Sequence, residues 1–169
     1  SAVDSYMFVI EAEGKRVLYT GDFRMHGVRG HVLEKLIRTY IGDVDVLITE
    51  GTSLSRNAHD GISEREVLDD ISSYIQDGKY VFVMSSSTNI DRIMEIWHNM
   101  PTDKVLICDA YQKRILDTVI DNVYYDSSLY RRPDSPLVLD IGAYPKYYMD
   151  NGFVSLVRGT ENYISQIKK

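Results

Sequence analysis

The first residue with a chemical use is Asp22, which follows a short apolar run and the turn-forming Gly21. An aspartate just past the end of a strand can reach into a cleft, and the glycine lets the backbone turn tightly beside a ligand. A carboxylate in such a place can bridge two divalent metal ions that activate water for hydrolysis. Taken alone, these residues favour a plainer role for Asp22, as a turn or helix-capping residue.

A second acidic residue, Glu50, stands at the end of the apolar run Leu47-Ile48-Thr49 and is followed by Gly51-Thr52. Its position predicts a carboxylate at the carboxyl end of another strand, and we expect it within hydrogen-bonding reach of the region around Asp22. The alternative is that Glu50 is a solvated residue at a strand end.

A third pattern is the polar run that separates an apolar strand from a helix near residue 85. Small hydroxyl side chains and free N–H groups at a helix N-terminus form an anion site, where a phosphate would dock. The alternative is plain helix capping by Ser87 or Thr88, and the two are compatible. Cys108-Asp109 follows another strand, which we expect to be a parallel neighbour opening at the same sheet edge. The candidate substrate contacts are Ser86, Ser87, Thr88, Asn89 and Arg92.

The histidines add little to these candidates. His26 lies four residues after Asp22 and could approach a metal, but a structural or surface role is favoured, and no two histidines have the spacing of metal ligands. Cys108 is predicted to be a buried, small apolar residue.

The elements that must position these residues follow from hydrophobic periodicity and turn signals. The capping-box pattern of Ser63 and Glu66 marks one helix start. The run 44–49 is apolar without alternation, which predicts a strand buried on both faces. Alternation of helices with short apolar strands predicts an α/β fold with a largely parallel sheet. We expect strands at 6–11, 16–20, 44–49, 80–84, 104–108, 136–141 and 153–157, and helices at 32–40, 64–76, 89–98, 110–119 and 161–167.

The net charge, the cysteine count and the length of the apolar runs limit the classes of protein to which this chain could belong. The 169 residues carry a net charge of −6, so the chain has no overall basic character and any contact with nucleic acid must be local. A single cysteine excludes an internal disulfide and predicts a reducing, cytoplasmic location. No apolar run is long enough to span a bilayer, so no membrane partner is expected.

Residues 1–24, with Asp4-Ser5 and Thr20-Gly21-Asp22-Phe23-Arg24, resemble the second half of a metallo-β-lactamase core. The resemblance implies that Asp22 is the aspartate shared by two zinc ions. Glu50-Gly51-Thr52 resembles the first motif of the β-CASP subgroup, which implies that Glu50 orients a downstream histidine acting on the leaving group. The segment 84–93 is similar to the Ser-Asn-Ile-x-Arg segment of ribonuclease J-like proteins, whose loop faces the substrate backbone.

The resemblance also implies a domain plan and an activity. Residues 1–52 would be a partial metallo-β-lactamase core of hairpin, helix and strand, and residues 53–169 a β-CASP-type α/β insertion. The intact parent would be a zinc-dependent hydrolase acting on phosphodiester bonds, with RNA as the expected substrate. The family's histidine motifs are absent, so the chain is expected to be a fragment. We expect it to be inactive alone, because catalytic zinc needs about three protein ligands.

Two other interpretations stay open. The chain could be a non-catalytic α/β binding or interaction module, and association of identical chains fits either interpretation. A flavodoxin-like nucleotide or phosphate binder ranks last, because the sequence has neither Gly-x-Gly-x-x-Gly nor a Walker Gly-Lys-Ser/Thr.

Overall fold

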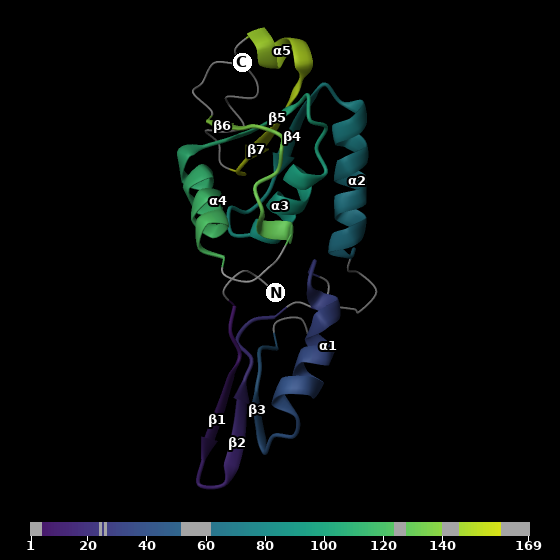
Figure 1. Ribbon diagram of the computed structural model, residues 1–169. Coiled ribbons are helices and arrows are strands. Elements are labelled where there is room, and N and C mark those ends of the chain that lie inside the picture. The colour runs from purple at the N-terminus through teal and green to yellow at the C-terminus, as the bar shows by residue number, and fades with distance from the viewer. Residues whose placement is uncertain are drawn as a thin grey trace. The chain divides into compact units, whose positions relative to one another are not determined.

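A computed structural model describes residues 5–23, 25, 27–51, 62–123, 128–139 and 146–159. The chain separates into two compact units, Ser1–Val67 and Leu68–Lys169, each described here by itself (Figure 1). The domain boundary predicted between residues 52 and 53, the loop that holds it, and the helix predicted at 161–167 lie outside the described residues. The fold class is α/β, as predicted.

The first unit contains a three-stranded sheet in the order β1-β2-β3. Strands β1 (Phe8–Ala12) and β2 (Lys15–Tyr19) form the predicted antiparallel hairpin. Glu13 and Gly14 both have positive φ, 51° and 70°, which is the backbone twist that a two-residue hairpin turn requires. Strand β3 (Val46–Ile48) then returns parallel to β2. This mixed sheet brings the ends of β2 and β3 to the same edge.

The helix predicted at 32–40 is present but irregular. It begins as a 3₁₀ turn, η1 (Gly30–Val32), continues as α1 (Leu33–Leu36), and widens into a π turn, η2 (Ile37–Ile41). The π turn closes where the Gly42 N–H donates to the Ile37 carbonyl at 2.9 Å. The connection between β2 and β3 is therefore helical, as is usual for a crossover between parallel strands.

The prediction that the run 44–49 is buried on both faces is wrong. All three residues of β3 are exposed within the described chain. The apolar pattern correctly indicated a strand, but burial depends on covering elements, and β3 has a strand partner on one side only, β2.

The second unit contains a four-stranded, fully parallel sheet in the order β4-β7-β5-β6. Its helices include one that the sequence did not indicate, α5. The elements are α2 (Glu64–Asp77), β4 (Tyr80–Met84), α3 (Ile90–His98), β5 (Val105–Cys108), α4 (Ala110–Asn122), the 3₁₀ turn η3 (Ser128–Tyr130), β6 (Leu137–Leu139), α5 (Lys146–Asn151) and β7 (Phe153–Val157).

Strand β7, the last that the structure describes, lies between β4 and β5. It pairs in parallel with both, Phe153 standing opposite Tyr80 on one side and Val105 on the other. The expectation that β4 and β5 are direct neighbours is therefore wrong, because a strand from far along the chain separates them. All four strands still end at one edge.

The core of the second unit lies on this sheet and on α3. Leu106 and Val154, in the two central strands, are fully buried, as are Met94 and Trp97 on α3. Cys108 is buried and free, as predicted. In the part of the chain that the structure describes, no helix is long and apolar enough to cross a membrane.

The capping box predicted before α2 is confirmed. The Ser63 backbone N–H donates to Glu66 Oε2 at 2.8 Å, and the Glu66 N–H donates back to Ser63 Oγ at 3.2 Å. The Ser63 hydroxyl also donates to Glu66 Oε2 at 2.6 Å, and this bond and the one from the Ser63 backbone N–H hold the pKa of the Glu66 carboxyl below its usual range. They satisfy donors that a helix start leaves open and fix where α2 begins.

Candidate functional site

The two predicted acidic residues come together where β2 and β3 leave their sheet. The last rung pairs Tyr19 with Ile48, and the Thr20 N–H then donates to the Ile48 carbonyl at 3.0 Å. The Thr20 hydroxyl donates to Thr49 Oγ1 at 3.1 Å. The segments that follow β2 and β3 therefore run side by side for one more residue beyond the strands.

Glu50 contacts the backbone directly after Asp22. Its Oε1 accepts a hydrogen bond of 3.1 Å from the Phe23 N–H. Gly21 turns the chain with a φ of +57°, a value that a residue with a side chain rarely adopts. Asp22 is exposed and Glu50 is half-buried. The half-buried carboxylate thus holds the loop, while the exposed one is left facing solvent.

These two carboxylates do not by themselves make a zinc site. Zinc in a catalytic site takes about three protein ligands. Within the described residues, no three histidine, cysteine, aspartate or glutamate side chains gather as a metal would require. His26 lies outside the described residues, and His31 lies in η1. The described residues therefore offer a partial donor set.

The third candidate, the polar run after β4, lies at the carboxyl edge of the second unit's sheet. The Ser85 N–H donates to the Val157 carbonyl at 3.2 Å, which joins the ends of β4 and β7. The exposed hydroxyls of Ser86 and Thr88 lie 2.9 Å apart. Ser87 is buried, whereas Asn89 and Arg92 are half-buried. Two exposed hydroxyls therefore precede α3.

The alternative prediction, that Ser87 or Thr88 caps the helix, is wrong. The N-cap of α3 is Asn89, and its side chain makes no capping bond. The hydroxyl of Ser86 instead accepts a long bond of 3.4 Å from the Thr88 N–H. Neither Ser87 nor Thr88 caps the helix, because the chain makes one further turn before α3 begins.

Arg158 was missed by the sequence reasoning. It follows β7 and forms an ion pair with Asp109 Oδ2, while Asp109 Oδ1 accepts from the Gln112 N–H at 2.7 Å and caps α4. The Arg158 guanidinium lies 5.4 Å from the centre of the Tyr111 ring. Only the insertion of β7 between β4 and β5 brings this cation to the edge.

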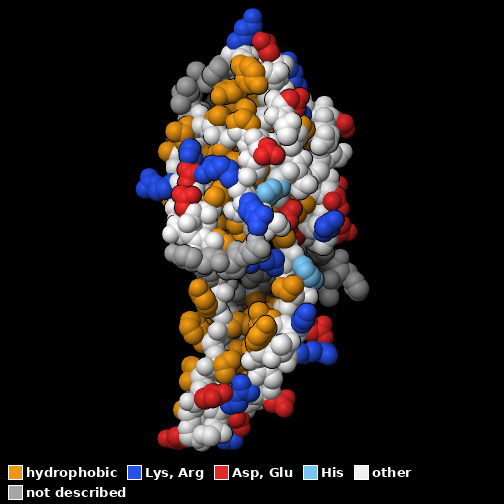
Figure 2. Space-filling view, in the orientation of Figure 1, with side chains coloured by type: hydrophobic (Ala, Val, Ile, Leu, Met, Phe, Trp, Pro, Cys, Tyr) orange, Lys and Arg blue, Asp and Glu red, His pale blue; other side chains and the backbone are white. Residues whose placement is uncertain are grey.

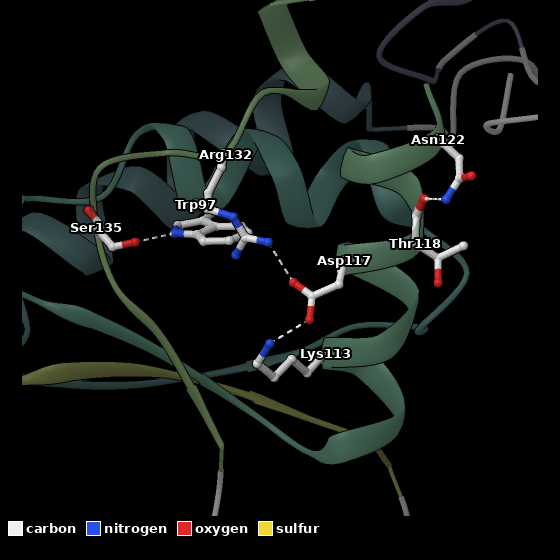
Figure 3. Close-up of polar contacts among 7 residues, drawn as sticks. All are labelled: Trp97, Lys113, Asp117, Thr118, Asn122, Arg132 and Ser135. Carbon is white, nitrogen blue, oxygen red and sulfur yellow. Dashed lines mark hydrogen bonds and ion pairs between the residues drawn. The ribbon is translucent and has the colours of Figure 1, made fainter. Parts of the chain in front are cut away.

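A shallow depression runs along α4, and none of the predicted site residues lines it. In it Asp117 accepts hydrogen bonds from Lys113 and Arg132, which hold the pKa of its carboxyl below the usual range (Figure 3). Arg132 also lies over the ring of Trp97, whose Nε1 donates to the Ser135 carbonyl at 2.7 Å. The depression is lined by Ala110, Lys113, Arg114, Asp117, Thr118, Asp121, Asn122 and Leu139. Its charges are balanced, so it favours no ligand of either sign.

Comparison with known proteins supports the fold and goes no further. No protein-family model matches the chain, and no curated protein matches it. The crystal structure of a protein of unknown function from Enterococcus faecalis V583 matches with a TM-score of 0.63 at 16% sequence identity. The match covers 95% of this chain but only 40% of that protein. A similar fold therefore occurs within a longer polypeptide.

Proposed function

We propose that this chain is part of a zinc-dependent hydrolase of the metallo-β-lactamase fold and its β-CASP subgroup, acting on RNA phosphodiester bonds in the cytoplasm. The observation that carries the proposal is the hydrogen bond from Phe23 N–H to Glu50 Oε1. It joins the two acidic motifs at the ends of adjacent parallel strands, which is the placement that the resemblance requires.

In this proposal the two carboxylates have different roles. Asp22, exposed at the turn, is the metal ligand, and Glu50 positions the loop that carries it. The remaining zinc ligands would come from outside the described residues. Catalysis therefore belongs to the intact protein, and the 169-residue chain alone is expected to be inactive.

The substrate side of the proposal rests on the carboxyl edge of the parallel sheet. Ser86 and Thr88 present hydroxyl groups there, and Arg158, ion-paired with Asp109, lies directly after β7. Ligands of open α/β sheets bind at the carboxyl ends of the strands. We assign this edge to the phosphate backbone of RNA, with Asn89 and Arg92 as flanking contacts and Ser87 as the buried support of the loop.

Zinc calorimetry on this chain and on the full product of its gene tests the proposal. We expect zinc binding and cleavage of an RNA oligonucleotide only with the full product, and Asp22→Ala should weaken zinc binding at least tenfold. Asp43→Ala is the matched control, because Asp43 is an exposed aspartate of the same unit. RNA cleavage by the 169 residues alone, lost on Asp22→Ala, would contradict the assignment of catalysis to the intact protein.

A second candidate function is a non-catalytic binding module. The observation in its favour is that the second unit has a core of its own, with Leu106, Val154 and Trp97 buried. The same titration separates the two, because a binding module takes up no zinc in either polypeptide.

A further inference from the structure

Tyr111 is an exposed aromatic residue with a cation beside its ring. It stands in the first turn of α4 and is 51% exposed. The Arg158 guanidinium lies 5.4 Å from the centre of the ring, and Asp109, the N-cap of α4, holds Arg158 by an ion pair. Residues that follow β5 and β7 thus meet in one corner of the carboxyl edge of the parallel sheet, where open α/β sheets bind ligands.

Two further rings with a cation nearby do not offer such a surface. Trp97, which lies under Arg132, is 1% exposed. Tyr80, which lies near Lys79, begins β4 at the opposite edge of the sheet, and its hydroxyl donates to a backbone carbonyl of α5 at 2.6 Å. Tyr111 combines exposure, a neighbouring cation and a position at the ligand-binding edge.

The charge of this corner is balanced, which argues against a phosphate there. Asp109 Oδ1 accepts from the Gln112 N–H, so a carboxylate already occupies the N-terminus of α4. The other oxygen of Asp109 pairs with Arg158. Lysine and arginine side chains are interspersed with aspartate and glutamate over the second unit in Figure 2. A phosphate would meet the Asp109 carboxylate in this corner, whereas an uncharged planar group would not be repelled.

We infer that Tyr111 and Arg158 form a stacking platform for a nucleobase of single-stranded RNA, an inference that rests on the proposed function. Bases of single-stranded RNA stack on tyrosine rings and on arginine guanidinium planes. The hydroxyls of Ser86 and Thr88 follow β4, which β7 alone separates from β5. Two strand spacings are about 10 Å, so an RNA whose phosphate lies at these hydroxyls can place a neighbouring base on Tyr111.

Such a platform would select RNA by its pairing state and not by its sequence. Every base has a face that can stack, so the contact is tolerant of base identity. A base in a duplex is already stacked on its neighbours and is not open to the ring. We therefore expect unpaired RNA of any sequence to bind this edge more tightly than duplex RNA.

Fluorescence anisotropy of a labelled oligouridylate with the 169-residue chain tests the inference. Tyr111→Leu should weaken binding about fivefold or more, the contribution of one base stacked on an aromatic ring, and Tyr111→Phe should retain the original affinity. Tyr74→Leu is the matched control, because Tyr74 is another exposed helical tyrosine, 71% exposed on α2. An oligonucleotide of the same length without bases should bind equally well with and without Tyr111→Leu.

Arg158→Gln separates a base from a phosphate in this corner. Removing a side chain that neutralises a phosphate lowers the slope of the salt dependence by about one, whereas removing a stacking cation does not. We expect Arg158→Gln to weaken binding of the oligouridylate with an unchanged salt dependence. A lower slope would overturn the inference, because it would place a phosphate beside Arg158.

The remaining outcomes distinguish the inference from the proposed function. Weaker binding on Ser86→Ala, with none on Tyr111→Leu, would overturn the inference and leave the assignment of this edge to RNA standing. Weaker binding of the base-free oligonucleotide on Tyr111→Leu would also overturn the inference. A chain that binds no oligouridylate at all would remove both the inference and the proposed RNA edge.

Discussion

Two strands of this protein contain the same three residues in the same order and end in opposite environments. Val46-Leu47-Ile48 of β3 are 48%, 56% and 49% exposed, whereas Val105-Leu106-Ile107 of β5 are 2%, 0% and 2% exposed. The tripeptide is sufficient to specify a strand in both places. It does not specify burial, which the neighbouring elements decide.

The neighbours of the two strands explain the difference. Strand β5 lies between β7 and β6 and has ladders on both sides, and α3 contributes its own fully buried side chains to the same unit. Among the strands that the structure describes, β3 is an edge strand of its sheet and pairs only with β2. The free energy of apolar burial follows the area removed from water, so the same residues contribute unequally to stability.

The largest expected effect compares the central leucines of the two strands. Leu106→Ala should lower the free energy of unfolding by about 2–5 kcal/mol, because it leaves a cavity in a closed core. Leu47→Ala should cost less than about 1 kcal/mol in this chain, because more than half of the Leu47 side chain already faces water. Urea denaturation followed by Trp97 fluorescence measures the second unit, and hydrogen exchange at Leu18 measures the first.

Equal costs for the two substitutions would break the comparison and show that the exposure of β3 is not that of the protein in solution.

Local features of the fold were predictable because local residues determine them. The strands Tyr80–Met84 and Phe153–Val157 match their predicted bounds, and the Ser63 capping box specified the start of α2. The hairpin turn followed from Glu13-Gly14. The position of β7 was not predictable in this way, because it depends on pairing between residues far apart in the sequence.

The same distinction, between features set by local residues and features set by long-range strand pairing, applies to the candidate site. The closeness of Asp22 and Glu50 was expected from the resemblance, and it arises in the structure because each residue follows a strand and the two strands are parallel neighbours. The pairing of Arg158 with Asp109 could not, since it depends on where β7 enters the sheet. The helix cap at Asn89 was missed because several adjacent residues have suitable side chains.

Gln112 provides the next test of the second unit, because its buried side chain contains a hydrogen-bond donor without a partner in the described part of the chain. Its side chain is buried on α4, and its Nε2 has no hydrogen-bond partner in the described part of the chain. A buried donor without a partner costs about 1–3 kcal/mol. Gln112→Leu should therefore raise the free energy of unfolding by about 1 kcal/mol, as measured by urea titration of Trp97 fluorescence. A loss of stability would mean that the amide has a partner in solution, and Gln112→Glu, which keeps the shape, should be destabilising.

The smallest effect compares one aspartate from each unit. Asp117 accepts hydrogen bonds from Lys113 and Arg132. Asp45 accepts hydrogen bonds from the Lys15 ammonium group and from the Arg16 N–H. In both cases these bonds lower the pKa of the carboxyl group from the ordinary value of 3.8. A carboxyl whose pKa is lower in the folded state contributes stability above its unfolded pKa, and loses it as the pH falls through the folded pKa. The contributions of both should therefore be complete at neutral pH and disappear below 3.8.

Asp117→Asn should cost about 0.5 kcal/mol at neutral pH, the size of a partly exposed ion pair, and nothing in acid. Because Arg132 lies over the Trp97 ring, the fluorescence of Trp97 should report this loss directly. Asp45→Asn should leave that signal unchanged and speed hydrogen exchange at the Arg16 N–H, which Asp45 Oδ2 accepts at 2.9 Å. A pH-independent penalty for Asp117→Asn would show that packing, and not charge, holds α4 to the segment that carries Arg132. A change in Trp97 fluorescence on Asp45→Asn would contradict the assignment of the signal to the pairing of Asp117 with Arg132.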